Sequence, residues 1–188
     1  MKFINAVTGI IHNRFPTWNL KIFTFFVILS VGFILLIRHS KLNTKQRIAS
    51  AGLFFYSYNV LIVTLLSRTP YYEYRYELMP FSFIPEIIKN GRLTPILEFP
   101  LNIALFLPIG FILPYLINRV SRYADTMIIG FLATFSIEIL QLVTKLGSFE
   151  ADDIIANLLG TWLGLLLYKK VRRRYLQKKK LCRRRQEF

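Results

Sequence analysis

Three apolar stretches of the sequence each carry an acidic side chain together with an amide side chain at a spacing that places both on one face of a helix. The pairs are Glu98 with Asn102, Glu138 with Gln141, and Asp153 with Asn157. A charged side chain inside a membrane-spanning helix costs roughly 3 kcal/mol, so each acid needs a partner or a function. Carboxylates can act as general acids or bases, and their oxygen atoms can bind divalent cations.

Glu138 and Asp153 are the candidate catalytic residues. Glu138 would act as general acid or base, and Asp153 as its charged partner or as a cation ligand. Arg68, at the outer end of a predicted span, is the nearest cation for pairing with Glu138. The alternative is structural: the three amides would be interhelical hydrogen-bond partners worth about 0.6 kcal/mol each, and Asp152 and Asp153 would be first-turn acids that complement a helix dipole.

The composition indicates the elements that hold these residues. The chain has 188 residues, of which 54% are hydrophobic and 19% charged, which is typical of a membrane protein. A helix needs about 20 apolar residues to cross the bilayer core. The sequence therefore predicts an all-α fold, a polytopic membrane helix bundle with about five transmembrane helices. The predicted spans are Leu20 to Ile37, Ile48 to Leu66, Glu98 to Ile117, Thr126 to Val143 and Asp152 to Tyr168.

The basic residues predict the orientation of these spans. Alternating spans place seventeen Lys and Arg residues on one face of the membrane and eight on the other. The positive-inside rule makes the first face cytoplasmic, with the N-terminus outside and the C-terminus inside. Glu138 then lies about 18 Å into a core about 30 Å thick, in its outer half. The other acids and amides lie within the first turns below the outer surface, so we expect one shared polar pocket that opens toward the outer leaflet.

The chain divides into four segments by composition. Residues 1–19 form an interfacial helix or a free tail, residues 20–66 hold two spans, residues 67–168 hold an external loop and three spans, and residues 169–188 form a basic cytoplasmic tail. The tail has eleven basic residues and one acid. It either binds anionic membrane lipids or is a disordered segment that only fixes topology. No recognition fold accompanies the charge, which argues against nucleic-acid binding.

Small residues and prolines predict how the later spans pack. Gly160 and Gly164 follow Asn157 along one helix face and allow another helix to approach closely. Pro108 removes a backbone donor, so we expect a kink just below Asn102. The only cysteine is Cys182, and the two histidines lie in different segments, which argues against a disulfide and against a metal site built from cysteines or histidines. No cofactor is predicted, and nothing in the sequence indicates an oligomeric state.

The polar segments also resemble a known family. Residues 102–110 read Asn-Ile-Ala-Leu-Phe-Leu-Pro-Ile-Gly, ending in Gly110, and residues 136–141 read Ser-Ile-Glu-Ile-Leu-Gln. Residues 152–164 read Asp-Asp-Ile-Ile-Ala-Asn-Leu-Leu-Gly-Thr-Trp-Leu-Gly, and a Pro-Phe pair stands at 80–81. Their order and spacing are similar to those of the VanZ-like family over residues 67–168. Many relatives have an arginine shortly before the last motif, where this chain has Gly-Ser-Phe-Glu-Ala at 147–151.

The resemblance implies an integral protein of the bacterial plasma membrane, of a type linked to lowered susceptibility to teicoplanin and related lipoglycopeptides. The expected partners are membrane lipids, a lipid-linked cell-wall precursor or a lipoglycopeptide. The residues favour two readings: a protein that occupies or shields outer-leaflet sites, or an intramembrane enzyme that acts on a lipid-linked substrate through Glu138 and Asp153. A transporter fits less well, because no internal repeat is detectable.

Overall fold

The structure, a computed structural model, describes residues 20–38, 40–66, 70–81, 84–85, 94–116 and 123–186. The predicted interfacial segment 1–19 and Arg68 lie outside these ranges. The described residues confirm the all-α bundle, since four helices are long and apolar enough to cross a membrane and a further apolar helix precedes them. The five long helices are α2 (Leu20–Arg38), α3 (Thr44–Leu61), α5 (Thr94–Leu116), α6 (Tyr123–Thr144) and α7 (Ala151–Gln186).

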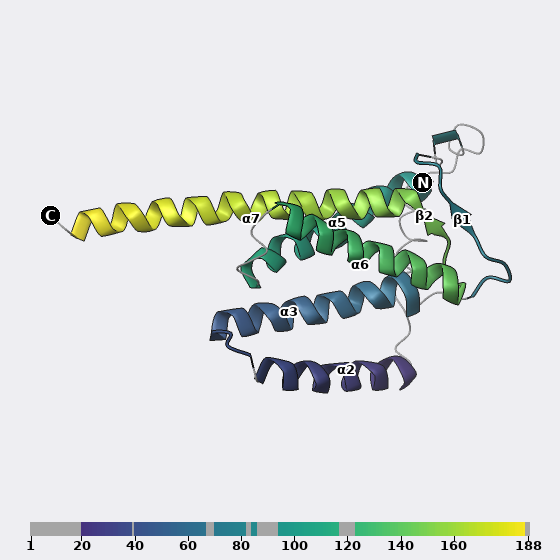
Figure 1. The fold of residues 1–188 in the computed structure, drawn as a ribbon, viewed down its shortest axis with the longest axis horizontal. Helices are drawn as coiled ribbons and strands as arrows, with labels where there is room; N and C mark the ends of the chain where they lie inside the picture. Colours follow the sequence, from purple (N-terminus) through teal and green to yellow (C-terminus); the bar gives the residue numbers. More distant parts are fainter. Residues whose placement is uncertain are drawn as a thin grey trace, which may run out of the picture.

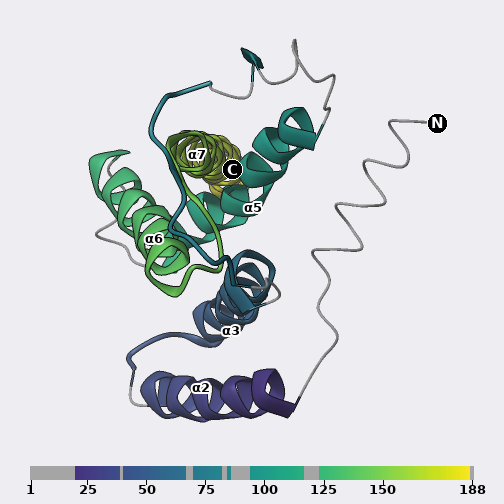
Figure 2. The ribbon, with the colours of Figure 1, turned by 90° about the vertical axis from the view of Figure 1, so that its right-hand side faces the viewer.

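Successive helices run in alternating directions, so α2, α5 and α7 point one way and α3 and α6 the other (Figure 1). Viewed along the bundle, α7 lies between α5 and α6, α3 packs below them, and α2 is outermost (Figure 2). A core cluster of Val60, Phe106 and Ile137 joins α3, α5 and α6. The hydroxyl of Tyr56 on α3 also donates to the carbonyl of Leu105 on α5 at 2.9 Å.

The ends of α3 have clear local causes. Asn43 and Gln46 form a capping box, in which each side chain accepts a hydrogen bond from the backbone of the other residue. At its other end α3 continues as the π-helix η1 (Ile62–Leu66). Such a wide turn is rare and frequently occurs at functional sites.

Glycines set the close approach of α5 and α7, which pack more extensively than any other helix pair. A Cβ atom added at Gly160 would lie 2.2 Å from the carbonyl oxygen of Ile103, and one at Gly164 would lie 2.1 Å from that of Leu107. In the opposite direction, a Cβ at Gly110 would lie 2.0 Å from the carbonyl oxygen of Thr161. The two backbones therefore touch, as small residues permit between membrane helices. α5 remains one helix through Pro108.

A short segment, residues 70–81, crosses the end of the bundle where α7 begins, and we call it the strap (Figure 2). Strand β1 (Tyr76–Glu77) pairs in parallel with β2 (Phe149–Glu150), the segment just before α7 (Figure 1). The amide of Phe149 donates to the carbonyl of Arg75 at 2.9 Å. At the other end of the bundle, α7 continues beyond the predicted limit of its span at Tyr168 and projects away from the other helices. The structure thus contradicts the disordered alternative for the basic tail up to Gln186.

Candidate functional site

The candidate site is built around the first turn of α7. Glu138 of α6 is only 1% exposed, and its Oε2 accepts a hydrogen bond from the backbone amide of Glu150 at 2.9 Å. Glu150 directly precedes α7. The first amides of a helix have no partner within the helix and carry partial positive charge, so they favour a carboxylate at this position. Glu138 therefore joins α6 to the start of α7.

The two acids in the first turn of α7 point to different partners. Asp152 Oδ1 accepts from the backbone amide of Phe81 in the strap at 2.7 Å. Asp153 Oδ1 accepts from Nδ2 of Asn102 on α5 at 2.5 Å, and Asn102 is 4% exposed. Carboxylate side chains thus connect the start of α7 to α5, to α6 and to the strap. Hydrogen bonds accepted by a carboxylate are a strong class.

The register of α6 and α7 places Glu138 and Asp153 at one level along the bundle. Gly130 of α6 faces Thr161, and the amide of Asn157 donates to the hydroxyl of Thr134 at 2.8 Å. Four residues forward on α6 correspond to four residues back on α7, as in any antiparallel helix pair. One further step of four brings Glu138 to the level of Asp153, which already contacts Asn102.

Two buried amides keep a polar atom to spare. Gln141 donates through Nε2 to the carbonyl of Thr64 in η1 at 3.0 Å, which joins α6 to the end of α3. Its Oε1 has no hydrogen-bond partner within the described part of the chain, and the same holds there for Oδ1 of Asn157. Gln141 is 1% exposed and Asn157 6% exposed. Buried polar atoms are rarely left without a partner, so each of these two needs an explanation.

A family model described as VanZ/LLP1 matches residues 23–173. The chain belongs to the VanZ/LLP1 family. No curated protein and no solved structure matches the chain. The match begins inside α2, takes in α3 and the segments that carry the resemblance, and leaves most of the basic extension of α7 outside.

The VanZ/LLP1 segments coincide with the contacts of the site. Asn102, Glu138 and Asp153 come from three different motifs and lie at the start of α7, where Asp152 also binds Phe81 of the Pro-Phe pair. Directly before α7 this chain has β2, which ends in Glu150. The Glu150 side chain accepts from the hydroxyl of Ser148, while its backbone amide binds Glu138.

The remaining predicted residues are placed as follows. Glu98 lies one turn before Asn102 on α5 and is half-buried. Arg68 lies outside the described residues, so its pairing with Glu138 stays a prediction.

Thr64 and Thr134 take part in the network although neither is among the site residues predicted from the sequence. Thr134 precedes Glu138 by four residues and could have been found from that spacing, whereas the carbonyl of Thr64 has no sequence signal.

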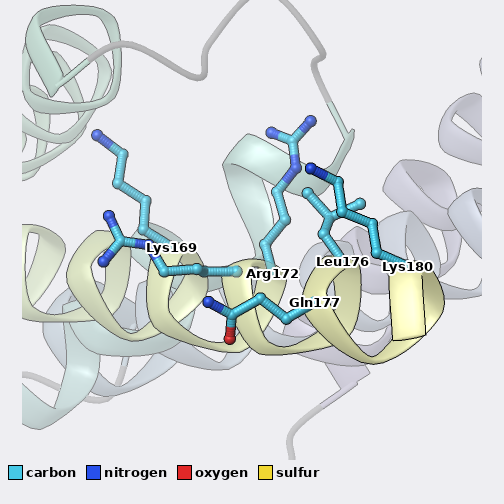
Figure 3. A pocket seen from close by; sticks show the side chains of 6 residues that line it. Lys169, Arg172, Leu176, Gln177 and Lys180 are labelled. Carbon is cyan, nitrogen blue, oxygen red and sulfur yellow. The ribbon is translucent and has the colours of Figure 1, made fainter.

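The basic extension of α7 is a separate surface at the opposite end of the bundle. A recess between its long side chains is lined by Lys169, Arg172, Arg173, Leu176, Gln177 and Lys180 (Figure 3). All six belong to one exposed helix, so the recess is a gap between flexible side chains and has no second wall among the lining residues. Its positive charge fits anionic headgroups near the membrane surface.

Proposed function

We propose that this VanZ/LLP1 protein acts in the outer half of the bacterial plasma membrane, at lipid or cell-wall-precursor sites, and so lowers susceptibility to teicoplanin and related lipoglycopeptides. The observation that carries the proposal is the convergence of buried carboxylates and amides from α5, α6 and α7 at one end of the bundle. Polar groups at such depth in a membrane protein are costly and mark functional sites. The positive-inside rule supports an outward position for this end.

The first test measures surface binding of a fluorescently labelled lipoglycopeptide to bacteria at matched expression. Cells with the wild-type chain are expected to bind less antibiotic than cells without it, and Glu138→Gln is expected to restore binding. Ser136→Ala is the matched control, because Ser136 is exposed and its hydroxyl bonds only to Leu132 of its own helix in the described contacts. Equal binding with and without the protein would argue against the proposal.

The orientation has its own test, which the wild-type sequence already provides. Cys182 is the only cysteine and its side chain is exposed on α7. Because the C-terminus is predicted to be cytoplasmic, a membrane-impermeant maleimide should label Cys182 in permeabilised cells and should not label it in intact cells. Labelling of intact cells would place the basic extension outside and remove the argument for an outer-leaflet site.

A second candidate function is an intramembrane enzyme that acts on a lipid-linked substrate. It is favoured by the common level of Glu138 and Asp153 and by Asn102, which orients the Asp153 carboxylate. In this reading Glu138 is the general acid or base. Lipid profiling of cells with Glu138→Gln distinguishes the two functions, because an enzyme loses a product and a shielding protein does not.

A further inference from the structure

The basic extension of α7 continues a membrane-spanning helix without a break and projects straight from the bundle (Figure 1). Tyr168 ends the apolar span, and its ring packs edge-on against that of Phe111 on α5, with 6.1 Å between the ring centroids. Residues 170–183 are exposed. An α-helix rises about 1.5 Å per residue, so each basic side chain of the extension is attached at a fixed distance from the end of the span.

Two runs of three arginines lie at very different distances from the membrane. The first run, residues 172–174, begins about 6 Å and ends about 9 Å beyond Tyr168. The headgroup layer extends about 5–8 Å beyond the hydrocarbon core, so these residues lie at its level. The second run, residues 183–185, lies about 22–26 Å beyond Tyr168. Salt screens charges over about 8 Å, so the second run is too far from the headgroups to attract them.

Close to the span, the basic residues share one side of the helix. Val171 and Tyr175 follow Tyr168 by three and seven residues, which places all three on the face that Tyr168 turns toward α5. Five basic residues cover the other side, an arc of about 200° at about 100° per residue. These residues, which we call the proximal basic face, are Lys169, Lys170, Arg172, Arg173 and Arg174. The side chains of Lys169 and Arg172 extend away from the helix axis (Figure 3).

The same side of α7 is apolar and exposed within the span. Leu163 precedes Lys170 by seven residues, and Leu167 precedes Arg174 by seven, so each leucine lies on one face with a basic residue. The two leucine side chains are 40% and 44% exposed. In a membrane these side chains contact lipid, so an acyl chain that lies along them ends at the proximal basic face.

We infer that the proximal basic face binds the phosphate groups of anionic phospholipids in the adjoining leaflet, and that residues 183–185 take no part in this binding. A guanidinium group suits a phosphate because its planar N–H donors can bind two oxygen atoms at once. The exposed leucines favour a phospholipid over a soluble polyanion, which has no acyl chain to lie on them. This face lies at the opposite end of the bundle from the candidate site, so lipid binding here is independent of the proposed function.

The test reconstitutes the full-length chain in nanodiscs that contain equal amounts of phosphatidylglycerol and phosphatidylcholine, in about 0.15 M salt. Native mass spectrometry then counts the lipids that stay bound after release from the discs. The wild-type chain is expected to retain phosphatidylglycerol at least fivefold over phosphatidylcholine, since each basic residue near an anionic surface strengthens association by roughly that factor. Nanodiscs expose both membrane faces, so the result does not depend on the orientation of the chain in cells.

Two matched triple variants locate the binding. R172Q/R173Q/R174Q removes three charges at the headgroup level and should lower the preference for phosphatidylglycerol at least fivefold. R183Q/R184Q/R185Q removes the same number of charges from the same helix and should leave the preference unchanged. Glutamine is about as good a helix former as arginine, so α7 should persist in both variants.

Three results would overturn the inference. The first is an unchanged preference in R172Q/R173Q/R174Q, and the second is an equal loss in both variants, which would mean that the extension folds back onto the membrane. The third is displacement of phosphatidylglycerol by an oligonucleotide at equal phosphate concentration, which would make the face a surface for soluble polyanions. A spin label on the exposed Cys182, about 21 Å beyond Tyr168, checks the geometry. A water-soluble relaxation agent should reach this label, whereas contact with an agent confined to the lipid would contradict the exclusion of residues 183–185.

Discussion

The contact of Gly160 with the backbone of α5 leads to a quantitative prediction. A methyl group at this position would lie 2.2 Å from the carbonyl oxygen of Ile103. Carbon and oxygen atoms on adjacent helices approach to about 3.3 Å, so Gly160→Ala must separate α5 and α7 locally by roughly 1 Å. Such overpacking costs about 1–3 kcal/mol, and the better helix propensity of alanine returns up to about 1 kcal/mol.

The net loss of about 1–2 kcal/mol should lower the thermal midpoint of the purified protein in detergent by about 5 °C. Gly52→Ala is the matched control, because no atom lies within 4 Å of a Cβ added at Gly52. That variant gains helix propensity without a clash, so its midpoint should stay the same or rise. If both variants melt at the same temperature, α5 and α7 do not pack as described and the reasoning fails.

Three further predictions concern the polar contacts and the tail. Asp152→Ala removes the acceptor of the Phe81 amide, so hydrogen exchange at that amide should accelerate by at least tenfold. The control Asp125→Ala removes a first-turn acid of α6 and should leave this exchange rate unchanged. Thr134→Val leaves a buried amide of Asn157 without its partner and should lower the unfolding free energy by about 1–3 kcal/mol, measured by denaturant unfolding in micelles. Truncation after Lys170 should preserve any outer-leaflet activity in a correctly inserted chain, since the removed residues lie at the opposite end of the bundle from the site; loss of activity would contradict this assignment.

The membrane bundle and the close approach of another helix to Gly160 and Gly164 could be predicted from simple periodicities, whereas the identity of that helix, α5, comes from the structure. Apolar length located the helices, because the bilayer core sets a minimum span. The spacing of Gly160 and Gly164 predicted close packing, because only glycine leaves room for a neighbouring backbone. The far end of α7 could not be found in this way: hydropathy marks where the apolar residues end at Tyr168, but lysine, arginine and leucine are good helix formers and the helix continues.

Other contacts of the site have no sequence signal at all. Glu138 and Asp152 bind the backbone amides of Glu150 and Phe81, and any residue except proline offers such an amide. Their positions depend on how the strap folds over the end of the bundle. Similarly, the carbonyl of Thr64 accepts from Gln141 in a π-helical turn. A turn of this kind reflects tertiary packing, so local propensity does not predict it.

The pattern of partners separates residues whose contacts explain their place in the fold from residues that keep a buried polar atom in reserve. Asn102 and Asp152 each direct a side-chain atom at another element, which fully accounts for a structural role. Gln141 and Asn157 make the same kind of contact with one atom and keep the other buried without a partner among the described residues. Depth in the membrane singled out Glu138 from the sequence, whereas only the structure identifies the two amides that keep unused hydrogen-bonding capacity. An acceptor without a partner in a water-poor interior destabilises the fold it belongs to, so helix packing alone does not explain why these two amides stand at these positions.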